Sequence, residues 1–245
     1  MGWQEWLYPA SVLLAAYAVM GITGFGSALV AVPLLAWIWP LPEVVALVIL
    51  LDVPASMLHG GLNFRQVRWR AIGAMLPGMA VGALIGLWLM GQLDKRWPLF
   101  LLGLYITWVG WRTLRHGQQA ARALPGWTHH AGSGLVGVLE VMFATAGPMV
   151  IALLQRRLRE VAEIRATVPV VMVVAASIAI AVLFGAGQID RAHTFERWLV
   201  ALPIAFIGVV LGNRLARHIP PPAMRRAMAV LLIASGLSLT QHLWR

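Results

Sequence analysis

Most of this chain consists of apolar runs that are long enough to cross a lipid bilayer. Several runs extend for about 18 residues or more with at most one charged side chain, enough for an α-helix to span the roughly 30 Å hydrocarbon layer. Hydrophobic residues fill 60% of the 245 positions and charged residues 11%, against about 25% charged in an ordinary soluble domain. The sequence therefore predicts an all-α integral membrane protein.

The apolar runs divide into eight segments joined by short polar connections. Their expected ranges are 7–39, 43–62, 71–90, 97–114, 131–154, 166–186, 198–213 and 227–244. The N-terminal run has no basic start and no cleavage pattern, so we expect it to be retained. The formal charge of +10 lies in the connections, where basic residues orient a membrane protein, so no nucleic-acid partner is expected.

The two halves of the chain show weak similarity at a shift of 126 residues. The shift pairs Gly61 with Gly187, Arg65 with Arg191, Pro77 with Pro203, Gly82 with Gly208, Gly86 with Gly212, and Gly110 with Gly236. Transporter folds built from duplicated halves show such self-similarity. We predict a first repeat over 1–116, a cytoplasmic linker over 117–130 and a second repeat over 131–245.

The distribution of basic residues indicates that the fifth segment does not cross the membrane. If all eight segments cross, nine of the 19 basic residues lie on one side and ten on the other. If segment 131–154 is re-entrant, 14 share the cytoplasmic side, and Lys95, Arg96, Arg191, Arg197 and Arg245 lie opposite, which is the usual asymmetry. Folded at its middle, this segment gives two half-helices of about 11 residues.

The repeat extends the same prediction to the first segment, which at 33 residues is too long for one crossing. Each half is then one re-entrant hairpin, made of a broken helix, followed by three transmembrane helices. An odd number of crossings inverts the second half relative to the first. The expected fold is thus two inverted repeats with both termini in the periplasm.

The two broken segments carry the residues suited to bind an anion. Non-helical backbone at membrane depth occurs where it is buried in protein or lines a wet cavity. A helix that restarts there presents unpaired N–H groups and the positive end of its dipole. The predicted substrate-binding residues are Thr23, Gly24, Phe25, Gly26 and Ser27 in the first turn, and Thr145, Ala146, Gly147 and Pro148 in the second.

Small residues in membrane helices also serve close helix packing, and this is the competing interpretation of any glycine cluster. We assign the packing role to Gly78, Gly82 and Gly86 in the third segment, and to Gly208 and Gly212 in the seventh. Packing alone leaves the length of the first segment and the charge count unexplained.

At these residues the sequence resembles the sulfite exporter TauE/SafE family. The stretch GITGFGSALVAVPLLAWIWP is similar to the family's first-half pattern, and ATAGPMVIALLQRRLREVAEIRATVPV to its second-half pattern. The resemblance covers residues 17–239, with less glycine than usual in the second turn and Ile164 where phenylalanine is usual. It implies export of a small anion such as sulfite or a sulfonate, and it adds Arg165 to the substrate-binding candidates.

Three ionisable residues within the apolar segments are candidates for proton coupling. Asp52 and His59 lie on one face of the second segment together with Ser56, and Glu140 lies in the first arm of the fifth. An intramembrane charge is a functional hypothesis by default. The structural alternatives are a hydrogen-bonded Asp52, an interfacial His59, a Glu140 that braces the hairpin and an Arg165 that is an ordinary loop charge.

Other functional classes receive less support from the residues. The chain has no cysteine, no phosphate-binding loop with a lysine and no metal-spaced histidines, so we expect no cofactor and no metal. A passive anion channel with the same hairpins stays open as an alternative, as does an intramembrane hydrolase that pairs Ser27 with His59. Basic runs at 156–160 and 217–226 are expected to contact lipid headgroups.

Overall fold

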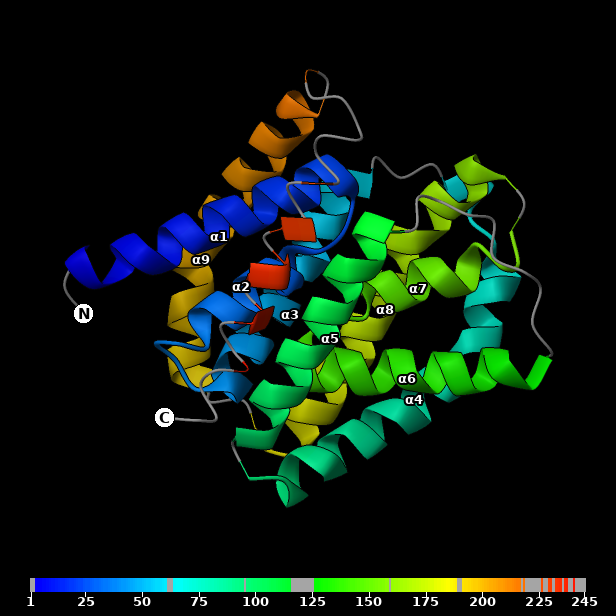
Figure 1. Cartoon of the computed structure of the whole chain (residues 1–245), viewed down its shortest axis with the longest axis horizontal. Helices are drawn as coiled ribbons and strands as arrows, with labels where there is room; N and C mark the ends of the chain where they lie inside the picture. Colours follow the sequence, from blue (N-terminus) through cyan, green and yellow to red (C-terminus); the bar gives the residue numbers. More distant parts are fainter. Residues whose placement is uncertain are drawn as a thin grey trace.

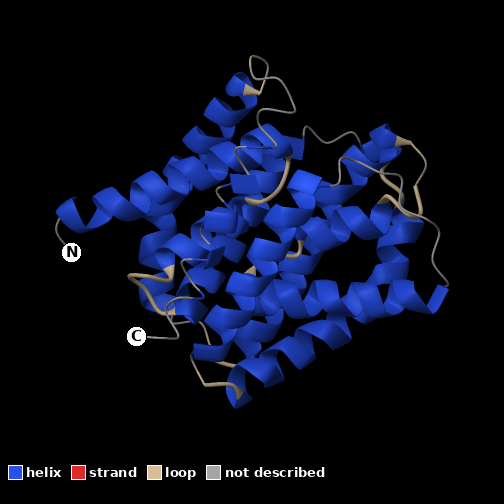
Figure 2. Ribbon diagram, in the orientation of Figure 1, coloured by secondary structure: helices blue, strands red, loops and turns tan. Residues whose placement is uncertain are grey.

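The computed structural model is a helical bundle (Figure 1). It describes residues 3–60, 64–94, 96–115, 126–158, 160–188, 191–216 and 218, and nine further positions from 226 to 240. Figure 2 shows helices and loops without strands in the described part of the chain. The helices are α1 (Trp3–Thr23), α2 (Ser27–Leu35), α3 (Leu41–Gly60), α4 (Trp69–Gln92), α5 (Arg96–Arg115), α6 (Gly126–Phe143), α7 (Gly147–Leu154), α8 (Val161–Gly185) and α9 (Arg191–Leu215).

The first and fifth apolar segments are each broken into two helices at the predicted turns. Between α1 and α2, Gly24 and Gly26 have φ angles of 82° and 94°, which glycine adopts without a steric penalty. Between α6 and α7, Ala144 has a φ of 55°, and it is the one non-glycine residue with positive φ in the described chain. Both breaks therefore follow from local backbone conformations that an α-helix cannot contain.

The arms of the fifth segment are not the equal half-helices that the sequence predicted. Helix α6 has 18 residues and α7 has 8, because the turn lies late in the apolar run and α6 begins at Gly126. The end of the predicted 117–130 linker is thus helical. The first segment divides in the same way, with 21 residues in α1 and 9 in α2.

Five helices of the described chain are long and apolar enough to cross a membrane. They contain the spans Trp6–Thr23, Leu41–Leu58, Trp69–Gln92, Ala166–Gly185 and Thr194–Leu215. Their outer faces carry large apolar side chains, such as Leu84 of α4 and Ile207 of α9, which are 59% and 54% exposed. Lipid is the environment that such faces require. Most of the eighth segment, 227–244, lies outside the described residues.

Glycines allow the closest helix crossings in the bundle, as the sequence predicted. Helix α4 packs on α6, and a Cβ at Gly82 would overlap the carbonyl oxygen of Gly134. Helix α1 packs on α9, and a Cβ at Gly212 would overlap the carbonyl oxygen of Ala18. The packing role assigned to Gly78, Gly82, Gly86, Gly208 and Gly212 is confirmed by these contacts.

The glycine contacts also link residues that the 126-residue shift pairs. Gly110 of α5 lies against Ala229 and Ile233, while Gly236 lies against Gly103 and Thr107 of α5. In the same manner, α1 of the first half packs on α9 of the second, and α6 of the second half packs on α4 of the first. The contacts between the halves are therefore reciprocal.

Candidate functional site

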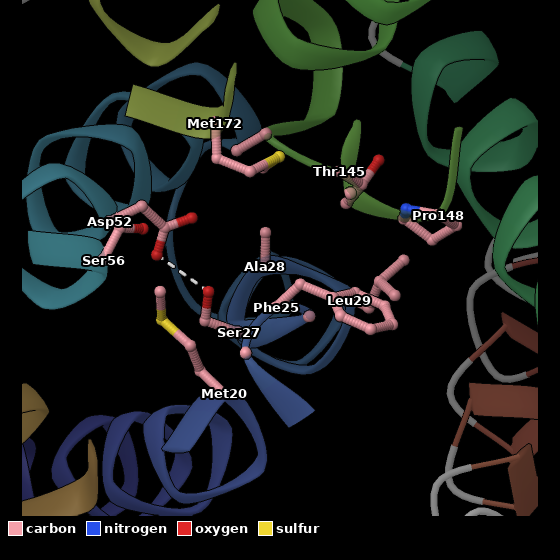
Figure 3. A pocket seen from close by; sticks show the side chains of 14 residues that line it. Met20, Phe25, Ser27, Ala28, Leu29, Asp52, Ser56, Thr145, Pro148 and Met172 are labelled. Carbon is pink, nitrogen blue, oxygen red and sulfur yellow. Dashed lines mark hydrogen bonds between the residues drawn. The ribbon is translucent and has the colours of Figure 1, made fainter. Parts of the chain in front are cut away.

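The starts of α2 and α7 line one pocket (Figure 3). From the first turn it is lined by Gly24, Phe25, Gly26 and Ser27, and from the second by Ala144, Thr145, Gly147 and Pro148. Asp52 and Ser56 of α3, Met172 of α8, and Met20, Ala28 and Leu29 complete the wall. The turn residues of two segments that lie 120 residues apart thus face a common space.

Asp52 is the acidic residue of this pocket, and two neighbouring helices bind it. Its Oδ1 atom accepts a hydrogen bond of 2.7 Å from the Ser27 hydroxyl of α2 and one of 2.8 Å from the Tyr17 hydroxyl of α1. Asp52 is 5% exposed and Tyr17 is fully buried. Asp52 therefore has the geometry of the structural alternative, in which it is hydrogen-bonded to neighbouring helices. Ser56 lines the pocket one turn further along α3.

The amide groups at the start of α2 have no side-chain cap. Gly26 occupies the N-cap position of α2 without a side chain to offer, and the following residues Ser27, Ala28 and Leu29 line the pocket. The first N–H groups of an α-helix have no intrahelical partner. This helix start is therefore a source of backbone donors and of positive dipole potential.

The start of α7 offers fewer backbone donors than the start of α2. Pro148 has no N–H, and the N–H of Met149 donates to the Ala146 carbonyl at 3.0 Å. The Gly147 N–H is then the backbone donor that remains in this turn. The Thr145 hydroxyl is a candidate side-chain donor beside it. The Thr145 Oγ1 atom is buried and has no hydrogen-bond partner among the described residues.

Glu140 braces the second turn without lining the pocket. Its Oε2 atom accepts a hydrogen bond of 3.3 Å from the Ala146 N–H, and its side chain is fully buried. Tyr105 of α5 holds the same turn by donating to the Thr145 carbonyl oxygen at 3.0 Å. The bracing role considered for Glu140 is therefore the geometry observed, and Glu140 does not line the pocket.

The pocket is small. Its volume is about 10 Å³, which corresponds to roughly one water molecule and is less than an oxyanion of four heavy atoms requires. The residues that line it include neither arginine nor lysine. Any anion held here would be bound by amide and hydroxyl groups, after the walls have moved apart.

A sequence profile described as "Sulfite exporter TauE/SafE" matches residues 9–239. The chain belongs to the sulfite exporter TauE/SafE family. It is 99% identical over 199 residues to the "Probable inner membrane transporter protein TsaS" of Comamonas testosteroni. The matched region covers 81% of this chain and 83% of that protein. It is 29% identical over 227 residues to the "Probable sulfite/organosulfonate exporter TauE" of Cupriavidus necator, covering 89% and 87%. No solved structure matches the chain.

The TauE/SafE turns contribute most but not all of the predicted residues to the pocket. Thr23 and Ala146 do not line it. The Thr23 hydroxyl donates to the Val19 carbonyl at 2.9 Å, and the Ala146 amide donates to Glu140. Arg165 belongs to the second turn of α8 and is not in a loop. The side chains of Arg165 and His59 lie outside the described residues.

Met20, Met172 and Tyr17 were missed by sequence reasoning. Methionine and tyrosine in an apolar segment carry no signal of a polar site. A shift of 120 residues instead of 126 superposes the start of α2 on the start of α7, and it then pairs Asp52 with Met172 and Met20 with Glu140. This second shift was the signal available in the sequence.

Proposed function

We propose that the chain is a secondary transporter of the bacterial inner membrane that exports a small anion, bound where the starts of α2 and α7 meet. The observation that carries the proposal is the single pocket that both helix starts line. The names of the two relatives supply the substrate class, sulfite or an organosulfonate, and the membrane. The chemistry of the pocket supports it, since helix N-termini and hydroxyls are donors suited to an oxyanion.

Asp52 is the proposed proton carrier. A charged Asp52 next to the start of α2 repels an incoming anion, and its carboxylate already holds the Ser27 hydroxyl at 2.7 Å. Protonation removes that charge, so anion and proton would occupy the pocket together and leave together.

Glu140 is a second proton-coupling candidate, because it braces the second turn, and His59 is a third. Arg165 would attract anions toward the pathway.

The proposed topology is two inverted repeats, each with a re-entrant broken helix and three transmembrane helices. The two breaks, the reciprocal contacts of α1 with α9 and of α6 with α4, and the 14-to-5 charge distribution support it. Helix α1 is as long as a full span, so in this proposal it lies oblique to the membrane. The repeats are 1–116 and 131–245, with a cytoplasmic linker and periplasmic termini.

Accessibility mapping tests the topology. The chain has no cysteine of its own, so single cysteines introduced by Leu124→Cys and Gln155→Cys report separately. A re-entrant fifth segment requires both to react with an impermeant thiol reagent from the same side of the membrane. Reaction from opposite sides would show that this segment crosses.

Reconstitution tests the transport function. Proteoliposomes loaded with sulfite, an alkanesulfonate or a carboxylate would be given an imposed pH step, and efflux of each anion would be measured. We expect pH-driven efflux of sulfite or sulfonate, and the Asp52→Asn variant to lose its dependence on the pH step. If Asp52→Asn and Glu140→Gln both leave pH-driven flux unchanged, proton coupling by these residues is wrong.

The same assay separates the transporter from a passive channel. A channel follows only the electrochemical gradient of its own anion, so collapsing the proton gradient with an uncoupler would leave its flux unchanged at constant membrane potential. A proton-coupled transporter loses accumulation under those conditions. The hydrolase alternative requires a free Ser27 hydroxyl, whereas this hydroxyl donates to Asp52.

A further inference from the structure

Two ion pairs join the halves of the chain in a reciprocal way. Arg68, before α4 in the first half, binds Glu163 of α8 in the second, with 2.7 Å between Arg68 Nε and Glu163 Oε1. Arg197 of α9 in the second half binds Glu43 of α3 in the first, with 2.6 Å between Nη1 and Oε2. Each half thus supplies one arginine and one glutamate to contacts between the halves.

The two glutamates occupy equivalent positions in their helices. Glu43 is the third residue of α3, and Glu163 is the third residue of α8. Nine residues further along, α3 places Asp52 and α8 places Met172 in the wall of the central pocket. At 1.5 Å per residue, each ion pair is about 14 Å along its helix from the pocket.

The ion pairs lie at opposite ends of α3. Glu43 is in the first turn of α3, whereas Arg68 follows its C-terminal end after the 3₁₀ turn Phe64–Gln66. From Glu43 to Gly60 the helix rises by about 26 Å, close to the roughly 30 Å thickness of the hydrocarbon layer. One ion pair is therefore near each face of the membrane, with the pocket between them.

Further contacts fix each pair to its surroundings. The Arg68 backbone N–H donates to the buried Thr167 hydroxyl at 3.1 Å. The Arg197 guanidinium lies over the Trp39 ring, 4.4 Å from its centre. In each pair one side chain is shielded, since Glu163 is 12% exposed and Arg197 13%, so opening the contact leaves a shielded charge without its partner.

We infer that the Arg68–Glu163 and Arg197–Glu43 ion pairs are the two gates of the pathway through the pocket, one at each membrane face. The inference rests on the proposed function, in which the pocket is the anion site. Both ion pairs are formed in this structure, in agreement with a pocket of only about 10 Å³. Transport then requires one pair to open while the other stays formed.

Thiol accessibility tests the gates without any transported anion. Ser56→Cys in the cysteine-free chain places a reporter in the pocket, where Ser56 is 4% exposed. An impermeant maleimide is applied to right-side-out and to inside-out vesicles. We expect Arg68→Gln to raise the labelling rate from one side and Glu43→Gln to raise it from the other, each by about two- to fivefold, the range for a partly exposed ion pair.

Control variants separate gating from general loosening. Arg70→Gln removes an exposed charge two residues from Arg68 and should leave both rates unchanged. The charge-exchanged double variants R68E/E163R and E43R/R197E should restore slow labelling. If a single variant does not yield folded protein, Glu163→Gln or Arg197→Gln breaks the same pair from the shielded partner.

The inference is overturned if both variants raise labelling from the same side, if neither changes it, or if Arg70→Gln has the same effect. Its failure is distinguishable from failure of the proposed function, because labelling needs no substrate. Opposite labelling with no anion efflux would overturn the proposed function and support the gates. Efflux with unchanged labelling would overturn only the gates.

Discussion

The Ser27 hydroxyl donates a hydrogen bond of 2.7 Å to Asp52 Oδ1, and this bond joins the first residue of α2 to the middle of α3. The same oxygen accepts the Tyr17 hydroxyl of α1 at 2.8 Å. A single carboxylate thus holds both arms of the first broken segment against a third helix. The stability of the turn and the chemistry of the pocket consequently depend on the same group.

Removing the Tyr17 hydroxyl should destabilise the protein and leave Asp52 with one donor fewer. For Tyr17→Phe we expect a loss of about 1 to 3 kcal/mol, because the lost hydrogen bond is buried and goes to an acidic group. Tyr8→Phe is the control, since the Tyr8 hydroxyl donates to the Leu34 carbonyl at an exposed position. Thermal unfolding in detergent measures both, and an equal effect of the two changes would contradict the role given to Tyr17.

The left-handed conformation of Gly26 should be required for transport. Gly26→Ala puts a side chain at a φ of 94°, which costs about 1 kcal/mol or more and moves the start of α2. Gly187→Ala is the matched control for Gly26→Ala. Gly187 also has a positive φ, 67°, but it lies outside the pocket with open space around its Cβ position. We expect a similar loss of thermal stability in both and a loss of anion efflux in Gly26→Ala alone. Unimpaired efflux by Gly26→Ala would argue against the α2 start as a binding element.

Replacing Ala144 with glycine should raise the stability of the protein. Its φ of 55° is unfavourable for a residue with a Cβ, so Ala144→Gly should relieve about 1 kcal/mol of strain. Ala152 lies inside α7 in ordinary helical conformation, and Ala152→Gly should lower stability by about 0.5 to 1 kcal/mol. The sign of the change in melting temperature distinguishes the two variants, and a fall in both would contradict the assignment of strain to Ala144.

Adding one methyl group where α4 crosses α6 should destabilise the protein. A Cβ at Gly82 overlaps the Gly134 carbonyl, so Gly82→Ala should destabilise the protein by about 1 to 3 kcal/mol. Gly73 lies in the same helix with nothing within 4 Å of a Cβ, and Gly73→Ala should be neutral or slightly stabilising. Comparing their thermal unfolding in detergent tests the contact. Equal tolerance of both changes would mean that the helices are not in backbone contact.

The sequence predicted the elements whose causes are local. Gly24 and Gly26 break the first segment because glycine readily adopts positive φ, and Pro148 marks the first turn of a new helix in the fifth. Asp52 and Ser56 share a face by helical periodicity alone, and both line the pocket. The eventual lengths of the arms were not predicted, since they depend on how far α6 continues into a connection of mixed composition.

The partners of these residues could not be predicted, because they come from contacts between distant segments. Tyr17 meets Asp52 across 35 residues, and Arg68 meets Glu163 across 95. Nothing local distinguishes Arg68 from its exposed neighbour Arg70. Once the helix starts Ser27 and Gly147 are superposed, however, the matching positions of Glu43 and Glu163 become visible in the sequence itself.

The glycine crossings limit which parts of this protein can move separately. At Gly212 against Ala18, and at Gly82 against Gly134, backbone lies against backbone with no room for a side chain between the two helices. We therefore expect α1 and α9 to move as one unit, and α4 and α6 as another, although the members of each pair come from different halves of the chain. We expect any change in shape to separate these helix pairs from the rest of the bundle, and not to separate one half of the chain from the other.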